Sequence, residues 1–210
     1  MVPDELLKKI KEMVALNLGL DFFSSRDYDI EKGLIGLGRE HGVKAGDQVA
    51  LVNWLESTDW PRAKLDNLAI YLTVGETFFF REKPHLEVFR EVMIPELLNL
   101  SHRTGMPVTI WSAGCCTGEE PYTLAMILRE VLHEQQLRHF AIVGSDINHQ
   151  FLHAAQQGNY RIWSFREAPD ETGQRFFGNT GDTWSIRDEV RKMVSFRYFS
   201  LVGAYNMTFP

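Results

Sequence analysis

A glycine-containing turn followed by two acidic residues is the part of this sequence best suited to binding a ligand. Gly114 and Gly118 bound the turn, and Glu119 and Glu120 open the helix expected after it. Glycines let a ligand approach the backbone closely, although such turns also occur simply for packing. A pyrophosphate group binds at the positive N-terminal end of such a helix. Two carboxylates at that end would repel it, so they favour a positively charged ligand. Acidic residues also stabilise any helix N-terminus, and this structural explanation stays open for both glutamates.

Asp146 adds a third carboxylate, 28 residues after Gly118 and just after an apolar run at residues 140–144. In nucleotide-binding α/β folds, an acidic residue at the end of that strand accepts hydrogen bonds from ribose hydroxyls. Asp146 could also cap the helix expected from Asn148, which does not exclude a ribose contact. Together, the turn and its acidic residues describe an adenosine ligand with a cationic tail and no phosphates. S-adenosylmethionine fits that description.

The elements that must position these groups alternate along the chain. A β-rich run at residues 107–111 leads into the turn, and a helix is expected from 119 to about 136. A second strand follows at 140–144, and then a helix from about 148 to a stop at Gly158. The order strand, helix, strand, helix is typical of a parallel α/β sheet. The tail from residue 160 to 210 mixes turn residues with β-rich pieces such as 193–199.

The sequence before the sheet predicts helices. Asp4 is a candidate N-cap, Pro61 could open a fourth helix, and strand signals are absent from residues 1–72. Further on, Pro84 should open a helix that Pro95 kinks or divides. We therefore expect a helical domain at 1–72 and a second domain at 73–210. The apolar stripes that define the helices are Leu6, Leu7, Ile10, Met13 and Val14; Ile30, Leu34 and Leu37; Val49, Val52 and Leu55; Leu65, Leu68 and Leu72; and Leu86, Phe89, Val92 and Met93.

Composition excludes several classes of function. The 210 residues carry 22 basic and 28 acidic side chains, for a net charge of -6, so nucleic acid is not an expected partner. No apolar run approaches the roughly 18 residues of a membrane span, and no direct membrane insertion is expected.

Cys115 and Cys116 are neighbours whose Cα atoms should lie ~3.8 Å apart, below the usual disulfide range. We expect a reduced, cytoplasmic protein. His149 and His153 lack an evident third ligand, so no metal site is predicted.

Four segments of the chain resemble landmarks of one family. Residues 111–122 are similar to the glycine motif of the chemotaxis receptor glutamate methyltransferases, the CheR family, and residues 73–81 resemble the threonine–aromatic–arginine motif that precedes it. Residues 144–147 and 158–160 match the landmarks that follow. The resemblance implies an α/β fold in which a small N-terminal all-helical domain precedes a Rossmann-like S-adenosylmethionine-dependent methyltransferase domain. Among Phe78, Phe79 and Phe80, at least two should be core residues.

The resemblance also implies an activity. Such enzymes transfer a methyl group from S-adenosylmethionine to glutamate side chains on the cytoplasmic helical domain of a chemoreceptor, leaving S-adenosylhomocysteine. A glutamate carboxylate is already ionised at neutral pH, so it needs no general base, and the protein mainly positions the reactants. Arg81 would lie nearest the transferred methyl group, since a guanidinium orients a carboxylate well. The implied cofactor-binding residues are Thr77, Arg81, Ala113, Gly114, Glu119, Asp146, Ser200 and Leu201.

Two of the chain's departures from the family concern the cofactor site and the sheet. Ser200-Leu201 stands where the family has Asn-Leu for a contact on the adenine side, and the chain reaches Pro210 before the family's later strands. The resemblance therefore implies a truncated parallel sheet with an exposed edge through which the chain could self-associate. Whether this chain is active or an inactive fragment stays open. An alternative function is a non-catalytic module that binds S-adenosylmethionine or scaffolds a signalling complex.

Overall fold

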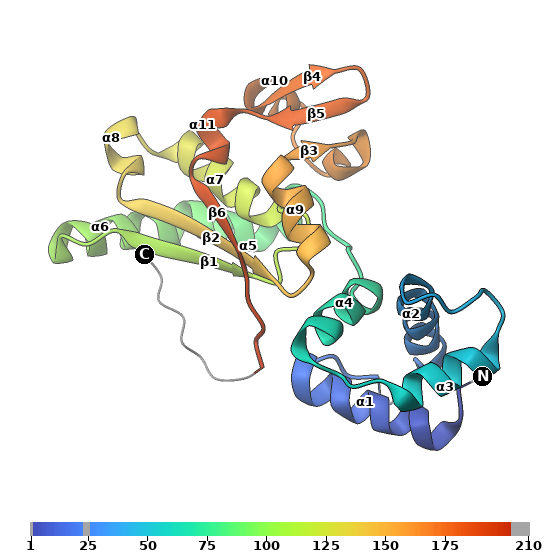
Figure 1. Cartoon of the computed structure of the whole chain (residues 1–210). Coiled ribbons are helices and arrows are strands. Elements are labelled where there is room, and N and C mark those ends of the chain that lie inside the picture. The colour runs from blue at the N-terminus through green and yellow to red at the C-terminus, as the bar shows by residue number, and fades with distance from the viewer. Residues whose placement is uncertain (1, 23–25, 203–210) are drawn as a thin grey trace. The chain divides into compact units, whose positions relative to one another are not determined.

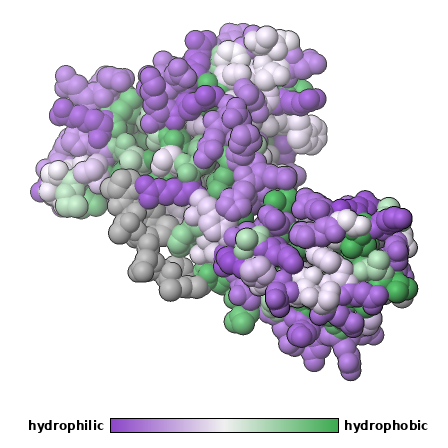
Figure 2. Space-filling model, in the orientation of Figure 1, coloured by the Kyte–Doolittle hydropathy of each residue, from purple (hydrophilic) through white to green (hydrophobic). Residues whose placement is uncertain are grey.

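The computed structural model describes residues 2–22 and 26–202, which form two compact units (Figure 1). The helical unit contains the described residues up to Val74, together with 147–149 and 199–202. The sheet unit contains Gly75–Asp146 and Gln150–Tyr198. No described helix is both long enough and apolar enough to cross a lipid bilayer. On the face shown in Figure 2, hydrophilic residues predominate, and hydrophobic side chains lie in small groups among them.

Four helices form the helical unit: α1 (Asp4–Leu18), α2 (Asp27–Glu40), α3 (Gln48–Ser57) and α4 (Arg62–Leu72). The stripes predicted for α2 and α4 are buried, as expected. The predicted cap Asp4 is wrong, because Pro3 holds the N-cap position and Asp4 is already helical. The stripe predicted for α3 is also partly wrong. Leu51 and Leu55, one turn apart, face the core, which leaves Val49 exposed.

The sheet unit is built on three parallel strands, β1 (Val108–Ala113), β2 (Phe140–Asp146) and β6 (Val194–Tyr198), in the order β1-β2-β6. Helix α7 (Glu119–Val131) and the single turn α8 (Glu134–Leu137) connect β1 to β2, and α9 (His149–Gln157) follows β2. The expected α/β class and parallel sheet are therefore confirmed. Ala113 pairs in register with Ser145, so the carboxyl ends of β1 and β2 lie side by side.

A second sheet was not predicted. It is antiparallel, in the order β3-β5-β4, and comprises β3 (Asn159–Tyr160), β4 (Phe177–Thr180) and β5 (Thr183–Ile186). The turn η2 (Ile162–Phe165) and the short helix α10 (Thr172–Phe176) lie between β3 and β4, and α11 (Asp188–Arg191) precedes β6. Strands of two to four residues are too short to show a clear alternation of apolar and polar residues, which explains why the sequence did not reveal them.

The segment before β1 is continuous but irregular. Helix α5 (Lys83–Val88) passes into a π-helical turn, η1 (Phe89–Met93), and then into α6 (Ile94–Thr104). Pro95 was predicted to kink or divide this helix; it lies in the first turn of α6, directly after the π-helical turn, and the chain stays helical through the junction. The apolar face predicted from Val92 and Met93 is wrong, because both are exposed. Phe89 is buried, as predicted. A π-turn takes more residues per turn than an α-helix, so the next buried residue is Ile94 instead of Val92 or Met93.

Candidate functional site

The turn between β1 and α7 is held in place by the end of β2. The N–H groups of Gly114 and Cys115 both donate to the carbonyl of Ser145, at 2.8 and 2.9 Å. The N–H of Cys116 donates to the carboxylate of Asp146 at 2.9 Å. Gly114, Cys116 and Gly118 all have positive φ, a conformation rare outside glycine. Asp146, which is only 8% exposed, therefore fixes the least favourable residue of the turn.

Glu119 is buried at the start of α7, with only 3% of its surface exposed. Its carboxylate accepts hydrogen bonds from the hydroxyls of Thr117, at 2.6 Å, and Ser164, at 3.0 Å. Burial raises the pKa of Glu119, although the two hydroxyls and the positive charge of Arg166 oppose the shift. Glu120 differs, because it is exposed and accepts from the Ser112 hydroxyl at 2.6 Å. The carboxylates predicted to act together thus lie in unlike environments.

The pH dependence of stability should reveal the burial of Glu119. Its pKa is raised in the folded state, so folding favours the protonated form, and that stabilisation is lost as the pH rises from the unfolded pKa through the folded one. We expect Glu119→Gln to lose this part of the pH dependence, so that the variant gains stability over the wild type as the pH rises from 4 to 8. Urea unfolding across that range measures the difference. A constant difference at every pH would contradict the expectation.

The aromatic segment is tied to the same helix end. Phe79 and Phe80 are core residues, which confirms that at least two of the three phenylalanines pack inside. The N–H of Phe79 donates to the carbonyl of Ser164 at 2.8 Å. The N–H of Phe80 donates to the hydroxyl of Thr123 at 3.2 Å, and that hydroxyl donates to the carbonyl of Glu119 at 2.7 Å. Ser164 and the first turn of α7 therefore hold both Glu119 and the aromatic segment.

Arg81 ends the aromatic segment with an exposed guanidinium group. It donates to the backbone carbonyl of Glu76 at 2.7 Å and lies 5.6 Å from the ring centre of Phe78. On the same ring, Arg166 stacks at 3.8 Å, and it forms an ion pair with Glu76 at 2.6 Å. Thr77, the threonine of this motif, is half-buried. A guanidinium group has five N–H donors, so Arg81 retains donors for an incoming carboxylate.

Six of the eight predicted site residues lie in the sheet unit: Thr77, Arg81, Ala113, Gly114, Glu119 and Asp146. Ser200 and Leu201 belong to the helical unit, after the end of β6, and the Ser200 hydroxyl donates to the carbonyl of Val202 at 3.2 Å. Their assignment stays a prediction. Sequence reasoning missed Ser164 and Arg166, which lie about 45 residues from Glu119 and belong to no motif. Thr117 could have been found, since a hydroxyl beside a helix start is a common hydrogen-bond donor or acceptor there.

The turn fits a small cationic ligand. A Cβ atom built on Gly114 would meet no atom within 4 Å, so space lies beside the backbone at this position. The carboxylates of Asp146 and Glu119 are hydrogen-bonded to Cys116 and Thr117 of the turn, and the exposed Glu120 adds a third carboxylate. Carboxylates accept hydrogen bonds from hydroxyl and ammonium groups. These acceptors suit the ribose hydroxyls and the ammonium group of S-adenosylmethionine, which are hydrogen-bond donors.

Two glycines of the turn should respond differently to alanine. At Gly118, φ is +93° and a Cβ would lie 2.9 Å from the Cβ of Ala155, so Gly118→Ala should cost roughly 2–5 kcal/mol of stability. At Gly114, φ is +74° but the space is open, so Gly114→Ala should cost only about 1–2 kcal/mol. The new methyl group at 114 should instead obstruct S-adenosylmethionine. Denaturant unfolding and calorimetric titration separate the two effects, and equal loss of stability in both variants would contradict them.

The two cysteines are packing residues, as the sequence predicted. Both are buried. Burial, together with the charge of Asp146, raises the pKa of Cys115 well above its ordinary value, and burial raises the pKa of Cys116 to about 11. A protonated thiol is a poor nucleophile. Neither residue is therefore suited to attack a substrate.

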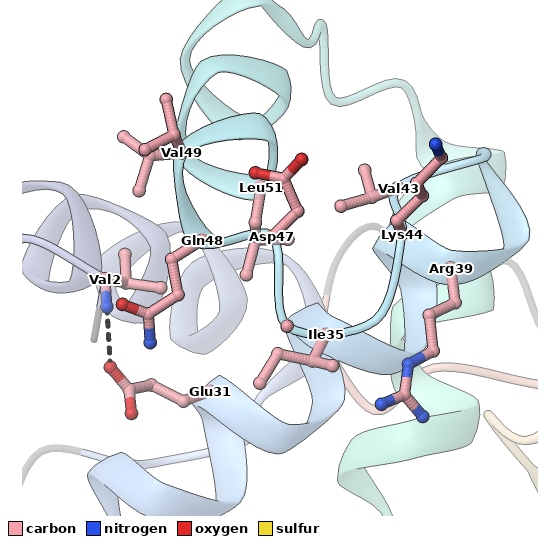
Figure 3. Close-up of a pocket in the computed structure, with 12 residues that line it drawn as sticks. Val2, Glu31, Ile35, Arg39, Val43, Lys44, Asp47, Gln48, Val49 and Leu51 are labelled. Carbon is pink, nitrogen blue, oxygen red and sulfur yellow. Dashed lines mark hydrogen bonds between the residues drawn. The ribbon is translucent and has the colours of Figure 1, made fainter.

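A separate hollow of about 620 Å³ lies in the helical unit, between the chain before α1, helix α2 and the start of α3 (Figure 3). Val2, Ile35 and Val49 supply apolar walls, and Glu31 closes one end by accepting from the N–H of Val2 at 2.8 Å. None of the predicted site residues lines it. Within residues 2–22 and 26–202, no three metal-binding side chains gather at one place. The turn after β1 remains the place where suitable chemical groups converge.

Comparisons with known proteins agree on one family. The profile described as "CheR methyltransferase, SAM binding domain" matches residues 75–209. The chain is 28% identical over 202 residues to a chemotaxis protein methyltransferase of Borreliella burgdorferi, which covers 95% of this chain and 70% of that protein. It is 29% identical over 193 residues to chemotaxis protein methyltransferase 1 of Pseudomonas aeruginosa, covering 89% and 68%. A Listeria innocua chemotaxis protein methyltransferase is 31% identical over 141 residues, covering 67% and 52%.

Proposed function

Since the chain belongs to the CheR methyltransferase family, we propose that it methylates glutamate side chains of a chemoreceptor-like signalling protein, with S-adenosylmethionine as the methyl donor. The match of residues 75–209 to the S-adenosylmethionine-binding domain carries this conclusion. The buried carboxylates around an open glycine turn support it. The product of the donor is then S-adenosylhomocysteine.

The proposed roles are those that the family resemblance implies for each residue. Asp146 receives the ribose hydroxyls, and Glu119 and Ala113 hold the methionine part beside Gly114. Thr77 is proposed as a further cofactor-binding residue, and Ser200 and Leu201 are proposed to contact the adenine. When bound, S-adenosylmethionine supplies an electrophilic methyl group on sulfur, which a carboxylate oxygen accepts to form an ester.

Arg81 is the residue that we propose to be catalytic. Its guanidinium group is exposed, and its bond to the Glu76 carbonyl fixes its position. A bidentate contact from such a group orients a carboxylate for in-line attack. The substrate glutamate is ionised at neutral pH, so the protein needs no base to activate it. Positioning is then the main contribution of the protein to the rate.

We propose further that residues 1–72 and 73–210 are two domains, that the substrate region is the cytoplasmic helical domain of the receptor, and that methylation takes place in the cytoplasm. Self-association remains a proposal too. In the described part of the chain, β1 pairs with β2 alone, and its other side offers backbone groups to another strand.

A second candidate is a module that binds S-adenosylmethionine without catalysis or merely scaffolds a signalling complex. Ser200 favours it, because a serine cannot supply the amide contact expected on the adenine side. Calorimetric titration with S-adenosylmethionine and S-adenosylhomocysteine distinguishes a ligand-binding protein from a scaffold. Transfer of a labelled methyl group to a chemoreceptor cytoplasmic fragment distinguishes an enzyme from a sensor. Binding of both ligands without any transfer would favour the second candidate.

A further inference from the structure

The turn η2 (Ile162–Phe165) has an inner side tied to the proposed site and an outer side exposed to solvent. On the inner side, Ser164 bonds to Glu119 and to the backbone of Phe79. Phe165 packs between the rings of Phe79 and Phe177, at 5.0 and 4.8 Å. These contacts fix the backbone of the turn relative to the aromatic segment.

On the outer side, Ile162 and Trp163 are 71% and 70% exposed. Single exposed hydrophobic residues are common and need no explanation. Two consecutive large hydrophobic side chains on a firmly held turn are more unusual. Together they present a rigid apolar surface to water. Trp163 is itself restrained, since Arg166 donates to its carbonyl at 3.0 Å and lies 4.8 Å from its ring centre.

Alternating cations and rings connect this surface to the proposed catalytic arginine. The guanidinium of Arg166 lies 4.8 Å from the ring of Trp163 and 3.8 Å from that of Phe78. The ring of Phe78 in turn lies 5.6 Å from the guanidinium of Arg81. The exposed indole is therefore only a few contact distances from Arg81. A helix rises about 10.5 Å in seven residues, so two side chains on one face of a helix can contact groups that are a few contact distances apart.

We propose that Ile162 and Trp163 form a docking surface for the receptor helix that carries the substrate glutamate. The inference rests on the proposed function. With the glutamate at Arg81, an apolar residue four or seven positions away on the same face of the helix would contact Trp163. The exposed guanidinium group of Arg81 suits the acidic residues that a methylated helix presents, whereas Arg166 is already paired with Glu76 and holds the indole of Trp163 in place. Tryptophan and arginine are also the residues that most often dominate binding energy at interfaces.

The test compares Trp163→Ala and Ile162→Ala with Met106→Ala. Met106 is a matched control, because it is 66% exposed in the same unit but precedes β1, at the other end of the strand from the turn. The readout is labelled methyl transfer to a chemoreceptor cytoplasmic fragment, with receptor concentration varied at saturating S-adenosylmethionine. We expect KM for the receptor fragment to rise at least fivefold in both test variants and to stay unchanged in Met106→Ala. Trp163→Phe should recover part of the loss.

The outcomes separate this inference from the proposed function. If the wild type transfers no methyl group, the proposed function fails first. If the wild type is active and Trp163→Ala has an unchanged KM, the docking surface alone is overturned. A weaker affinity of Trp163→Ala for S-adenosylmethionine, measured without receptor, would show a structural role and also overturn it. Sedimentation measures the oligomeric state of the wild type and of Trp163→Ala. If the variant loses a dimer that the wild type forms and its KM is unchanged, a second copy of the chain covers the surface instead of the receptor helix.

Discussion

Replacing Arg81 with alanine should lower kcat for receptor methylation about a hundredfold, because a reacting group displaced by 1 Å costs about that much. The guanidinium is exposed, bonded to the Glu76 carbonyl and set against Phe78, so its position is defined before substrate arrives. The substrate carboxylate needs no deprotonation, so its orientation is what the alanine variant loses. Single-turnover transfer of labelled methyl groups measures the rate of the chemical step.

The controls for Arg81 separate the effect of its positive charge from that of its planar guanidinium group. Arg81→Lys keeps a positive charge without the planar pair of donors, so it should recover only part of the rate. Arg103→Ala removes an exposed arginine from α6 in the same unit and should leave the rate unchanged. A rate within twofold of the wild type for Arg81→Ala would refute its catalytic role. A cooperative unfolding transition in each variant excludes a trivial loss of structure.

Asp146→Ala should weaken S-adenosylmethionine binding by about 1–3 kcal/mol, the range for hydrogen bonds to a charged group. This corresponds to a rise in Kd of roughly 5- to 150-fold. One oxygen of Asp146 already accepts from the N–H of Cys116, and a carboxylate has lone pairs for further donors such as ribose hydroxyls. The variant therefore loses both a ligand contact and the support of the turn. Calorimetric titration measures the change.

Asp146→Asn separates these two contributions. Its amide oxygen can still accept from the N–H of Cys116, so the turn should remain ordered, whereas the negative charge is gone. We expect its Kd to lie between those of the wild type and Asp146→Ala. Unchanged affinity in Asp146→Ala would exclude the ribose assignment. If both variants lost stability and affinity together, the role of Asp146 would be structural.

The sequence predicted the elements whose periodicity is regular. The stripes of α2 and α4 and the strand–helix order around the glycine turn follow from local pattern alone. The misplaced apolar face after Phe89 has a local cause, since one π-helical turn rotates every later residue. Helix α3 has apolar residues on two overlapping faces, one through Val49 and one through Leu51. The local pattern does not distinguish these faces, and the tertiary packing buries Leu51 and Leu55.

For the site, motifs identified the residues but not their partners. Glu119 was expected to pair with a cationic ligand, yet its carboxylate is already held by Thr117 and Ser164. Ser164 reaches it through an antiparallel sheet and a short turn that leave no clear pattern in the sequence. Long-range contacts of this kind depend on the tertiary fold rather than on spacing along the chain.

The adjacent thiols have a practical consequence for experiments on this protein. Cys115 and Cys116 are buried in the glycine turn after β1, and their thiols remain protonated at neutral pH. A thiol reagent can therefore modify them only during moments when the turn opens. The rate of alkylation is thus an intrinsic measure of local breathing at the glycine turn, and slower labelling in the presence of a ligand would report its occupancy without any added probe.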